Sequence, residues 1–166
     1  ITDGQIFLES DLFNAGMRPA VNVGLSVSRV GGAAQTKAMK KAAGSIRIDL
    51  AQYREMEVFT QFSSDLDAIT KEQLEYGKRL MELLKQPLSE PLSLHAQVIT
   101  LCAATHKLFL DVPVKELKKF QKDMLAYLDQ KHPQIGEEIE ELHSLSDTLI
   151  NKIIDAVKEY KSQVVK

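Results

Sequence analysis

Apolar side chains recur every three or four residues through most of this chain, and this spacing is typical of helices that bury one face. It predicts five helices, at about residues 33–62, 64–86, 94–110, 113–132 and 142–160. Five amphipathic helices with short connections can bury one core. The chain is therefore expected to be mainly α, with a helical bundle in its C-terminal part.

The ends of these helices carry local signals. Ser64 has the chemistry of an N-cap for the second helix, and Gly44 is a place where the first helix can bend. Pro133 should stop the fourth helix, because a proline cannot continue one, and Leu142 is the first apolar residue of the last helix. The third helix is apolar on most sides, so it is expected to be the buried, central one.

The front of the chain has a different composition. Six of the eight glycines lie in the first 44 residues, and glycine at this density favours loops and strands over helices. Residues 5–8 read as a short strand, residues 11–16 as one helical turn that Gly16 ends in the left-handed conformation, and residues 21–30 as a strand or an ordered loop. We therefore expect a boundary between two parts of the chain near residue 35.

Composition excludes several classes of protein. The 21 Lys and Arg residues nearly balance 23 Asp and Glu residues, so the net charge of -2 provides no general attraction to nucleic acid or anionic lipid. The longest apolar run, residues 96–104, is far too short to span a membrane as a helix. A single cysteine cannot form an internal disulfide, which favours a reducing compartment. The chain begins at Ile1 without Met or signal-peptide features, so we expect it to be a piece of a longer protein.

Two groups of residues offer chemistry. Cys102 and His106 lie four residues apart on one helix face, which suggests metal binding, but zinc requires four close ligands and a small buried cysteine is the simpler interpretation. We therefore expect no metal site.

Arg29 lies in a glycine-flanked, polar loop that leads into a helix. A guanidinium in this place can contact a phosphate bound by a neighbouring subunit, and the alternative role of Arg29 is a structural ion pair. No GxxxxGKS or GxxxxGKT sequence occurs in these 166 residues, so they cannot hold ATP and magnesium alone.

Four segments of the chain carry long and specific motifs. They are residues 1–8 (ITDGQIFL), 13–20 (FNAGMRPA), 26–35 (SVSRVGGAAQ) and 49–55 (DLAQYRE). These segments closely resemble the α-subunit family of the rotary F-type ATP synthases. The likeness is nearly literal through Gln86, and beyond that residue it extends to the layout and length of the helices. Because the α subunit is much longer, the chain resembles its C-terminal third.

The resemblance implies roles for five residues. Arg29 is implied to be the arginine finger that reaches the γ-phosphate in the adjacent catalytic β subunit, and Ser26 lies in the same motif at a position that the family requires for activity. Arg18 and Pro19 resemble residues that line the α subunit's own adenine pocket, and Gln86 resembles its adenine-contacting glutamine. The chain departs from the family's pattern two residues after Gln86, where a leucine replaces a second glutamine.

The resemblance also implies an assembly. In the family, three α subunits alternate with three β subunits around the central γ stalk, with a peripheral stalk alongside, as a peripheral complex on the cytoplasmic face of the bacterial inner membrane. Residues 1–35 then resemble the end of the nucleotide-binding domain, and residues 36–166 the helical C-terminal domain that faces the stalk. ATP or ADP with magnesium is implied as the cofactor of the full proton-translocating complex, and the isolated chain is expected to bind none and to be inactive. No nucleic acid and no membrane span are expected. A free-standing helical interaction module of related ancestry is the alternative.

Overall fold

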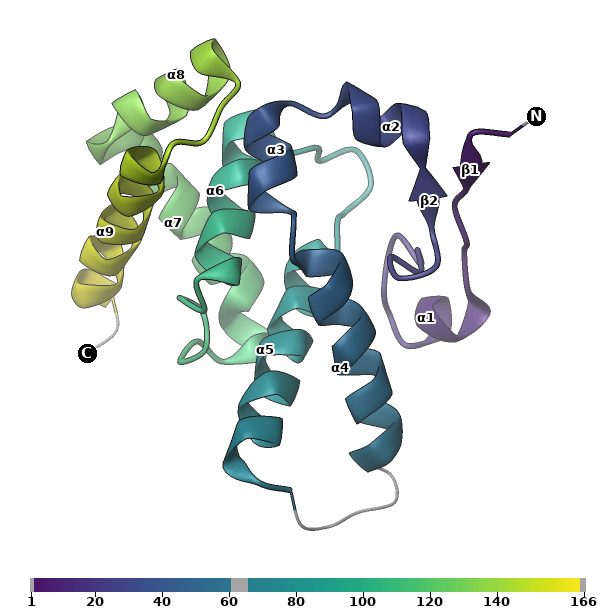
Figure 1. Cartoon of the computed structure of the whole chain (residues 1–166). Helices are drawn as coiled ribbons and strands as arrows, with labels where there is room; N and C mark the ends of the chain where they lie inside the picture. The colour runs from purple at the N-terminus through teal and green to yellow at the C-terminus, as the bar shows by residue number, and fades with distance from the viewer. Residues whose placement is uncertain (1, 61–65, 165–166) are drawn as a thin grey trace. The chain divides into compact units, whose positions relative to one another are not determined.

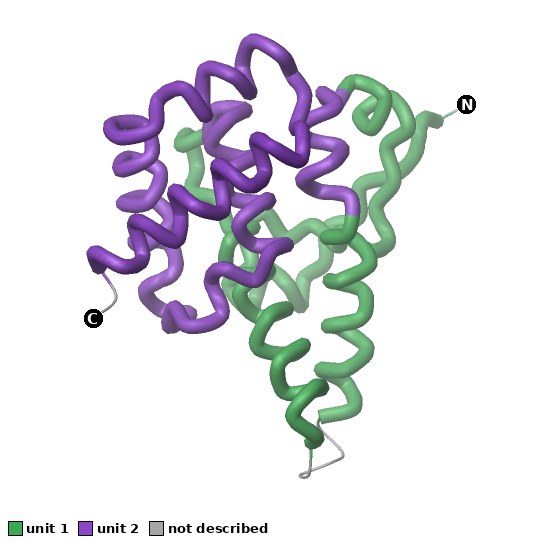
Figure 2. Tube along the Cα trace, turned by 60° about the vertical axis from the view of Figure 1, so that its left-hand side comes forward, with its two compact units in different colours: residues 1–34, 45–91 green, residues 35–44, 92–166 purple. Residues whose placement is uncertain are grey.

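The computed structural model of the chain describes residues 2–60 and 66–164, which are mainly helical (Figure 1). The chain forms two compact units, shown in different colours in Figure 2. Unit 1 consists of residues 1–34 and 45–91, and unit 2 of residues 35–44 and 92–166. Each unit thus takes two separate stretches of the chain. The boundary that the sequence predicts near residue 35, between the front of the chain and its helical part, stays a prediction.

Unit 1 combines a small sheet with four helices. Its elements are β1 (Gly4–Gln5), α1 (Ser10–Asn14), β2 (Val27–Ser28), α2 (Arg29–Ala34), α4 (Ile46–Thr60) and α5 (Ala68–Leu84). The two strands pair antiparallel, with Gly4 opposite Ser28, and an isolated bridge joins Leu8 to Val21. Gly16 follows α1 with φ of +83°, which confirms the predicted left-handed end of that helical turn.

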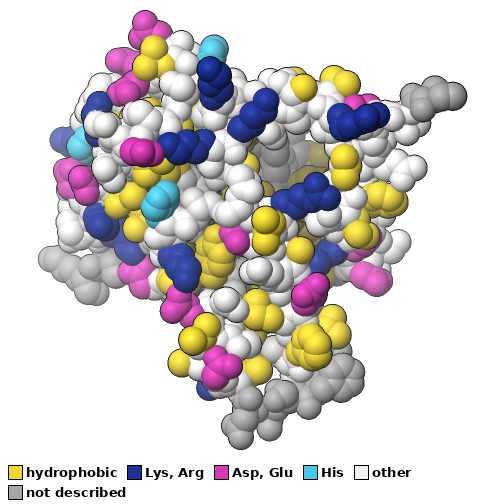
Figure 3. Space-filling view, in the orientation of Figure 1, with side chains coloured by type: hydrophobic (Ala, Val, Ile, Leu, Met, Phe, Trp, Pro, Cys, Tyr) yellow, Lys and Arg dark blue, Asp and Glu magenta, His cyan; other side chains and the backbone are white. Residues whose placement is uncertain are grey.

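The two long helices of unit 1, α4 and α5, pack side by side (Figure 1). The apolar period buries Leu50 and Tyr53 on α4 against a face of α5 that includes Leu80. Apolar side chains at the far end of this pair remain on the surface, as the lower part of Figure 3 shows. Among them, Phe59 is 71% exposed and Ile69 is 73% exposed, although both fit the helical period.

Unit 2 is a bundle built around one apolar helix. Its elements are α3 (Lys37–Ala42), α6 (Leu94–Thr105), the 3-10 turn η1 (Val114–Glu116), α7 (Leu117–Lys131), α8 (Pro133–Leu142) and α9 (Asp147–Val164). Helix α6 packs against α3, α7, α8 and α9, and seven of its twelve residues are buried. This arrangement confirms the prediction that the third helix of the apolar pattern is the central one.

Polar contacts fix the packing of unit 2. Gln121 on α7 donates a hydrogen bond from Nε2 to Thr100 Oγ1 on α6 at 3.2 Å, and both residues are buried. Near α3, the Ala38 amide donates to the carbonyl oxygen of His143 at 2.9 Å. A buried polar pair costs free energy when it is misaligned, so these contacts favour one packing register.

The prediction of one continuous helix over residues 33–62 is wrong. In the described part of this range the structure has the end of α2, then α3 and α4 as separate helices. Thr36 separates α2 from α3. Its Oγ1 accepts a hydrogen bond from the Met39 amide, so Thr36 is the N-cap with which α3 begins as a new helix. A turn at residues 43–45 separates α3 from α4, so Gly44 marks a break rather than a bend. The predicted N-cap Ser64 lies outside the described residues; Asp67 caps α5 by accepting from the Thr70 amide.

The last part of the chain also differs from the prediction. Pro133 does stop the fourth helix, since α7 ends at Lys131, but it is also the first residue of α8, a position that tolerates proline. His143, with φ of +49°, ends α8, so Leu142 belongs to α8 and is 58% exposed instead of opening the last helix. The central helix α6 ends at Thr105, five residues before the expected end at residue 110.

No helix in the described ranges 2–60 and 66–164 is long and apolar enough to cross a bilayer.

Candidate functional site

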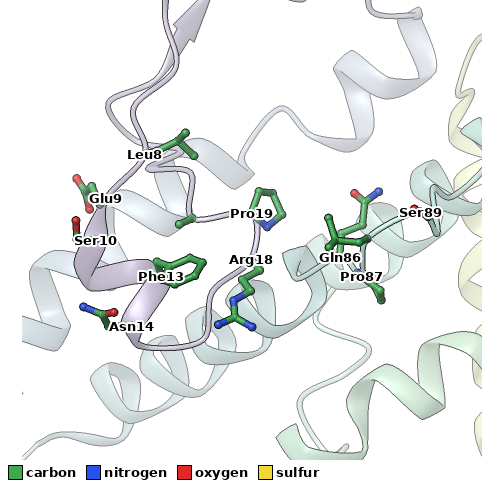
Figure 4. A pocket seen from close by; sticks show the side chains of 12 residues that line it. Leu8, Glu9, Ser10, Phe13, Asn14, Arg18, Pro19, Gln86, Pro87 and Ser89 are labelled. Carbon is green, nitrogen blue, oxygen red and sulfur yellow. The ribbon is translucent and has the colours of Figure 1, made fainter.

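A cavity of about 1410 Å³ lies in unit 1 between two segments that are far apart in sequence. One segment consists of α1 with the residues just before it and the loop that follows it, and the other is the stretch after α5 (Figure 4). The residues that line the cavity are Leu8, Glu9, Ser10, Phe13, Asn14, Arg18, Pro19, Ala20, Gln86, Pro87, Leu88 and Ser89. Three residues singled out in the sequence, Arg18, Pro19 and Gln86, are therefore brought to one place.

Two contacts define the walls of this cavity. The backbone amide of Gln86 donates a hydrogen bond to the backbone carbonyl oxygen of Arg18 at 2.8 Å, and this bond joins the two segments. The guanidinium carbon of Arg18 lies 4.6 Å from the centre of the Phe13 ring, and Figure 4 shows the two side chains next to each other. This cation–π contact holds the charge against one wall of the cavity. The Arg18–Pro19 peptide bond is cis.

The chemistry of these walls suits a flat, partly polar ring. Phe13, Pro19 and Leu8 provide apolar surface, while the side-chain amide of Gln86 offers both a donor and an acceptor. An adenine base presents the same combination of an apolar face and a polar edge. The residues present thus fit the adenine part of a nucleotide. Leu88, at which the resemblance implied a departure from the family's pattern, is 96% exposed and offers no polar atom from its side chain.

Arg29 and Ser26 form a second group in unit 1, and neither of them lines the cavity. Arg29 is the first residue of α2, so the expectation that a loop holds it is wrong. Its side chain is exposed, and its Nε donates to the Asp3 carbonyl oxygen at 3.4 Å. Among the residues that the structure describes, Arg29 forms no ion pair.

Asp3 fixes the backbone around Arg29. Its carboxylate accepts hydrogen bonds from the Val30 amide at 2.8 and 2.9 Å and from Ser28 Oγ at 2.9 Å. A carboxylate at this end of α2 caps the helix and interacts favourably with its dipole. Sequence analysis missed Asp3 because the cap comes from the residue just before β1, 27 positions away from Val30, and no local pattern announces it.

Ser26 has a different environment from Arg29. Its Oγ donates to the Asn22 carbonyl oxygen at 2.6 Å and accepts from the Phe7 amide at 3.0 Å. The hydroxyl therefore joins the turn at residues 22–26 to the segment before α1. Asn22, a buried residue that sequence analysis also missed, has a side-chain amide that contacts Glu9 on the wall of the cavity.

The pair of Cys102 and His106 lies in unit 2 at the end of α6. The Cys102 sulfur is 3.8 Å from His106 Nδ1, and the same nitrogen is 2.7 Å from the Cys102 carbonyl oxygen. Burial raises the pKa of the Cys102 thiol to about 11, although Lys41 nearby opposes the shift, so the thiol is neutral at physiological pH. Within residues 2–60 and 66–164, no three His, Cys, Asp or Glu side chains come together to hold a metal ion.

Comparison with known proteins gives a consistent result. Residues 35–160 match the family described as "ATP synthase alpha/beta chain, C terminal domain". A protein of Clostridium kluyveri named ATP synthase subunit alpha is 53% identical over 97% of this chain, which covers 32% of that relative. Proteins of the same name from Thermobifida fusca and Aquifex aeolicus are 55% and 52% identical, over 97% and 99% of the chain and 29% and 33% of their own lengths. The chain thus spans about a third of the length of these curated relatives.

Proposed function

Because residues 35–160 place the protein in the family of C-terminal domains of ATP synthase alpha and beta subunits, we propose that it works as part of a non-catalytic α subunit in a proton-translocating F-type ATP synthase. In this role it packs around the central γ stalk and contributes one residue to the catalytic site of the adjacent β subunit. The full complex binds ATP or ADP with magnesium, includes a peripheral stalk, and sits on the cytoplasmic face of the inner membrane.

The observation that carries the proposal is that Arg29 is exposed on a backbone that Asp3 holds in place. The backbone next to it is held by Asp3, while Arg29 itself is exposed and forms no ion pair in the described part of the chain. An exposed arginine on a backbone that is held in place can form paired hydrogen bonds to phosphate oxygens of a neighbouring subunit. In phosphoryl transfer, such a group stabilises the charge that spreads over the transferring phosphoryl oxygens.

The cavity supports the second half of the proposal, an adenine pocket of the α subunit itself. Arg18, Pro19 and Gln86 line the same cavity, although Pro19 and Gln86 are 67 positions apart in the sequence. The sequence has no phosphate-binding loop, so the phosphates and magnesium would be held by the rest of a full-length subunit. The isolated chain is therefore proposed to be inactive.

The proposal is tested in assembled rings that contain the full-length α subunit with Arg29→Ala or Arg29→Lys. We expect both rings to assemble and to load nucleotide, yet to lose about 10³ to 10⁵ in steady-state ATP turnover. Lysine should rescue poorly, because it lacks the planar fork of the guanidinium. Turnover should fall far more than binding, since the contact is made in the transition state.

Lys37→Ala provides the matched control, because Lys37 is an exposed cation that lies outside both groups of the candidate site. Its ring should turn over ATP like the parent, and the 166-residue chain alone should hydrolyse none. If an assembled Arg29→Ala ring hydrolyses ATP within about threefold of the parent, Arg29 is not an arginine finger.

A further inference from the structure

Asn22 is buried, with only 3% of its surface exposed, and each of its polar groups forms a hydrogen bond. Its amide donates to the Phe7 carbonyl oxygen at 2.9 Å, and its own carbonyl oxygen accepts from the amide and the hydroxyl of Ser26 at 3.0 and 2.6 Å. In the side chain, Oδ1 accepts from the Leu25 amide at 3.1 Å and Nδ2 donates to Glu9 Oε1 at 2.5 Å. Asn22 thus begins the turn at residues 22–26 and accepts the hydrogen bonds that hold it.

Glu9 connects this turn to the cavity. Its side chain lines the cavity, with one carboxylate oxygen bound to Asn22 and the other 3.4 Å from the Arg54 guanidinium on α4. The turn held by Asn22 continues directly into β2 and then into Arg29 at the start of α2. One amide side chain therefore lies between the wall of the cavity and the segment that carries Arg29.

We propose that Asn22 is a positioning residue that fixes the segment leading to Arg29, with the Glu9 carboxylate as its anchor. The proposal rests on the function proposed for Arg29, because it concerns where that guanidinium is placed. The side-chain amide of Asn22 accepts from the Leu25 N–H and donates to Glu9 at the same time, and a carboxylate at this position could not donate. An aspartate at position 22 would accept from Leu25 but would face the Glu9 carboxylate with a second negative charge.

The donor and acceptor between positions 9 and 22 can be exchanged. In the double variant Glu9→Gln with Asn22→Asp, the new glutamine amide donates to the new aspartate, whose other oxygen still accepts from the Leu25 amide. The pair of substitutions keeps the total charge and restores the hydrogen bond in the reverse direction. A residue that merely fills space would not respond to this exchange, so rescue by the double variant separates positioning from bulk.

The first experiment measures hydrogen exchange of the Leu25 and Ser26 amides in the full 166-residue chain. With Asn22→Asp we expect both amides to exchange at least about tenfold faster, because the turn opens more often. With the double variant, exchange should return to within about threefold of the parent. Amides in the middle of α4 report whether unit 1 stays folded, and Gln52→Ala, which removes an exposed amide side chain on α4, is the matched control.

The second experiment measures ATP turnover in assembled rings of the full-length subunit. Misplacing a catalytic group by about 1 Å can cost 10²-fold, so Asn22→Asp should lower kcat by about 10- to 100-fold while leaving KM nearly unchanged. The double variant should recover most of this loss, and Gln52→Ala should have none.

The outcomes separate the two proposals. Unchanged exchange of Leu25 and Ser26 in Asn22→Asp, or no recovery in the double variant while α4 stays protected, overturns the positioning role of Asn22. Normal turnover of the Arg29→Ala ring overturns the proposed function alone, because the exchange experiment uses no nucleotide. Faster exchange that the double variant reverses, together with a kcat that follows it, supports both.

Discussion

At the scale of single residues, Gly77 shows how closely α4 and α5 approach. A Cβ atom added there would lie 2.2 Å from Cδ2 of the Tyr53 ring and 2.6 Å from Tyr53 Cβ. The ring cannot easily move away, because Tyr53 is buried and its hydroxyl donates to Glu57 at 2.8 Å. Burial and that hydrogen bond also raise the pKa of Tyr53, so the ring stays neutral in its place.

We therefore predict that Gly77→Ala destabilises the chain. Alanine gains up to about 1 kcal/mol in helix propensity, but overpacking against Tyr53 costs about 1–3 kcal/mol and forces the helices apart. Urea unfolding followed by circular dichroism should show a lower midpoint. Gly32→Ala is the control, since a Cβ on this glycine of α2 meets nothing within 4 Å, and its midpoint should be unchanged or higher. Equal behaviour of the two variants would refute the close contact.

The residues of the candidate site differ in how far sequence could predict them. Arg18, Pro19 and Gln86 were identified through the resemblance, and their meeting in one cavity depends on packing between segments that no local pattern connects. Asp3 lies in a motif that assigns it no role, and Asn22 lies outside the four motif segments. Their importance lies in hydrogen bonds to distant parts of the chain, which exist only once the protein has folded.

At the scale of elements, His95 at the start of α6 joins three helices of unit 2. Its amide and its ring Nδ1 both contact Glu140 Oε1 on α8, at 3.0 and 2.8 Å, and its Nε2 is 3.5 Å from Asp129 on α7. The backbone hydrogen bond from His95, followed by the bond from its ring, lowers the pKa of the Glu140 carboxyl below its usual range.

This lowered pKa predicts an acid-dependent contribution to stability. The folded chain binds a proton at Glu140 less readily than the unfolded chain does, so the contribution is present above the unfolded pKa and is lost as pH falls through the folded pKa. Glu140→Gln should therefore lose less stability than the parent between about pH 6 and about pH 3, as measured by urea midpoints. The effect should be small, because the carboxylate is partly exposed.

Glu141→Gln is the matched control for this prediction, since the neighbouring carboxylate is exposed and forms no contact with His95 that the structure describes. Its midpoint should fall with acid as the parent's does. A Glu140→Gln variant that loses as much stability as the parent would show that the bond from His95 does not perturb Glu140 on folding.

The helices themselves were largely predictable, whereas their breaks were not. The apolar period correctly indicated a mainly α protein with a buried α6, because burying one face is a property of each helix alone. The breaks before and after α3 depend on short-range chemistry such as the Thr36 cap, which competes with a continuing period. Phe59 and Ile69 fit the period yet stay exposed, since a period shows which face is apolar and not whether anything covers it.

At the scale of the whole molecule, burial is unevenly distributed along the chain. In the described part of the first 34 residues, only Met17, Ala20 and Asn22 are buried. Unit 2, by contrast, has a continuous core that includes Val98, Ile153 and other residues with no exposed surface. Two-residue strands such as β1 and β2 are marginal in water, because they bury little apolar surface.

Native-state hydrogen exchange of the protein should follow this distribution. Amides of β1, β2 and α1 should exchange at least about 10²-fold faster than those in the middle of α6, because local opening costs little where few apolar contacts are lost. Sedimentation should first establish that the sample is monomeric, since pairing with a second copy would protect the exposed edge of β1. Protection of the front equal to that of α6 in a monomer would contradict the prediction.

The split origin of unit 2 has a consequence for how the protein is made on the ribosome. Helix α3 docks through Ala38 and through an ion pair between Lys41 and Asp147, two residues 106 positions apart. Synthesis proceeds from the N-terminus, so α3 emerges long before its partners near residue 143 exist. The intervening residues of unit 1 are complete by then. The nascent polypeptide can therefore pack α3 against α6 first, whereas the contacts of Ala38 and Lys41 with residues 143 and 147 form only after these later residues have been synthesised.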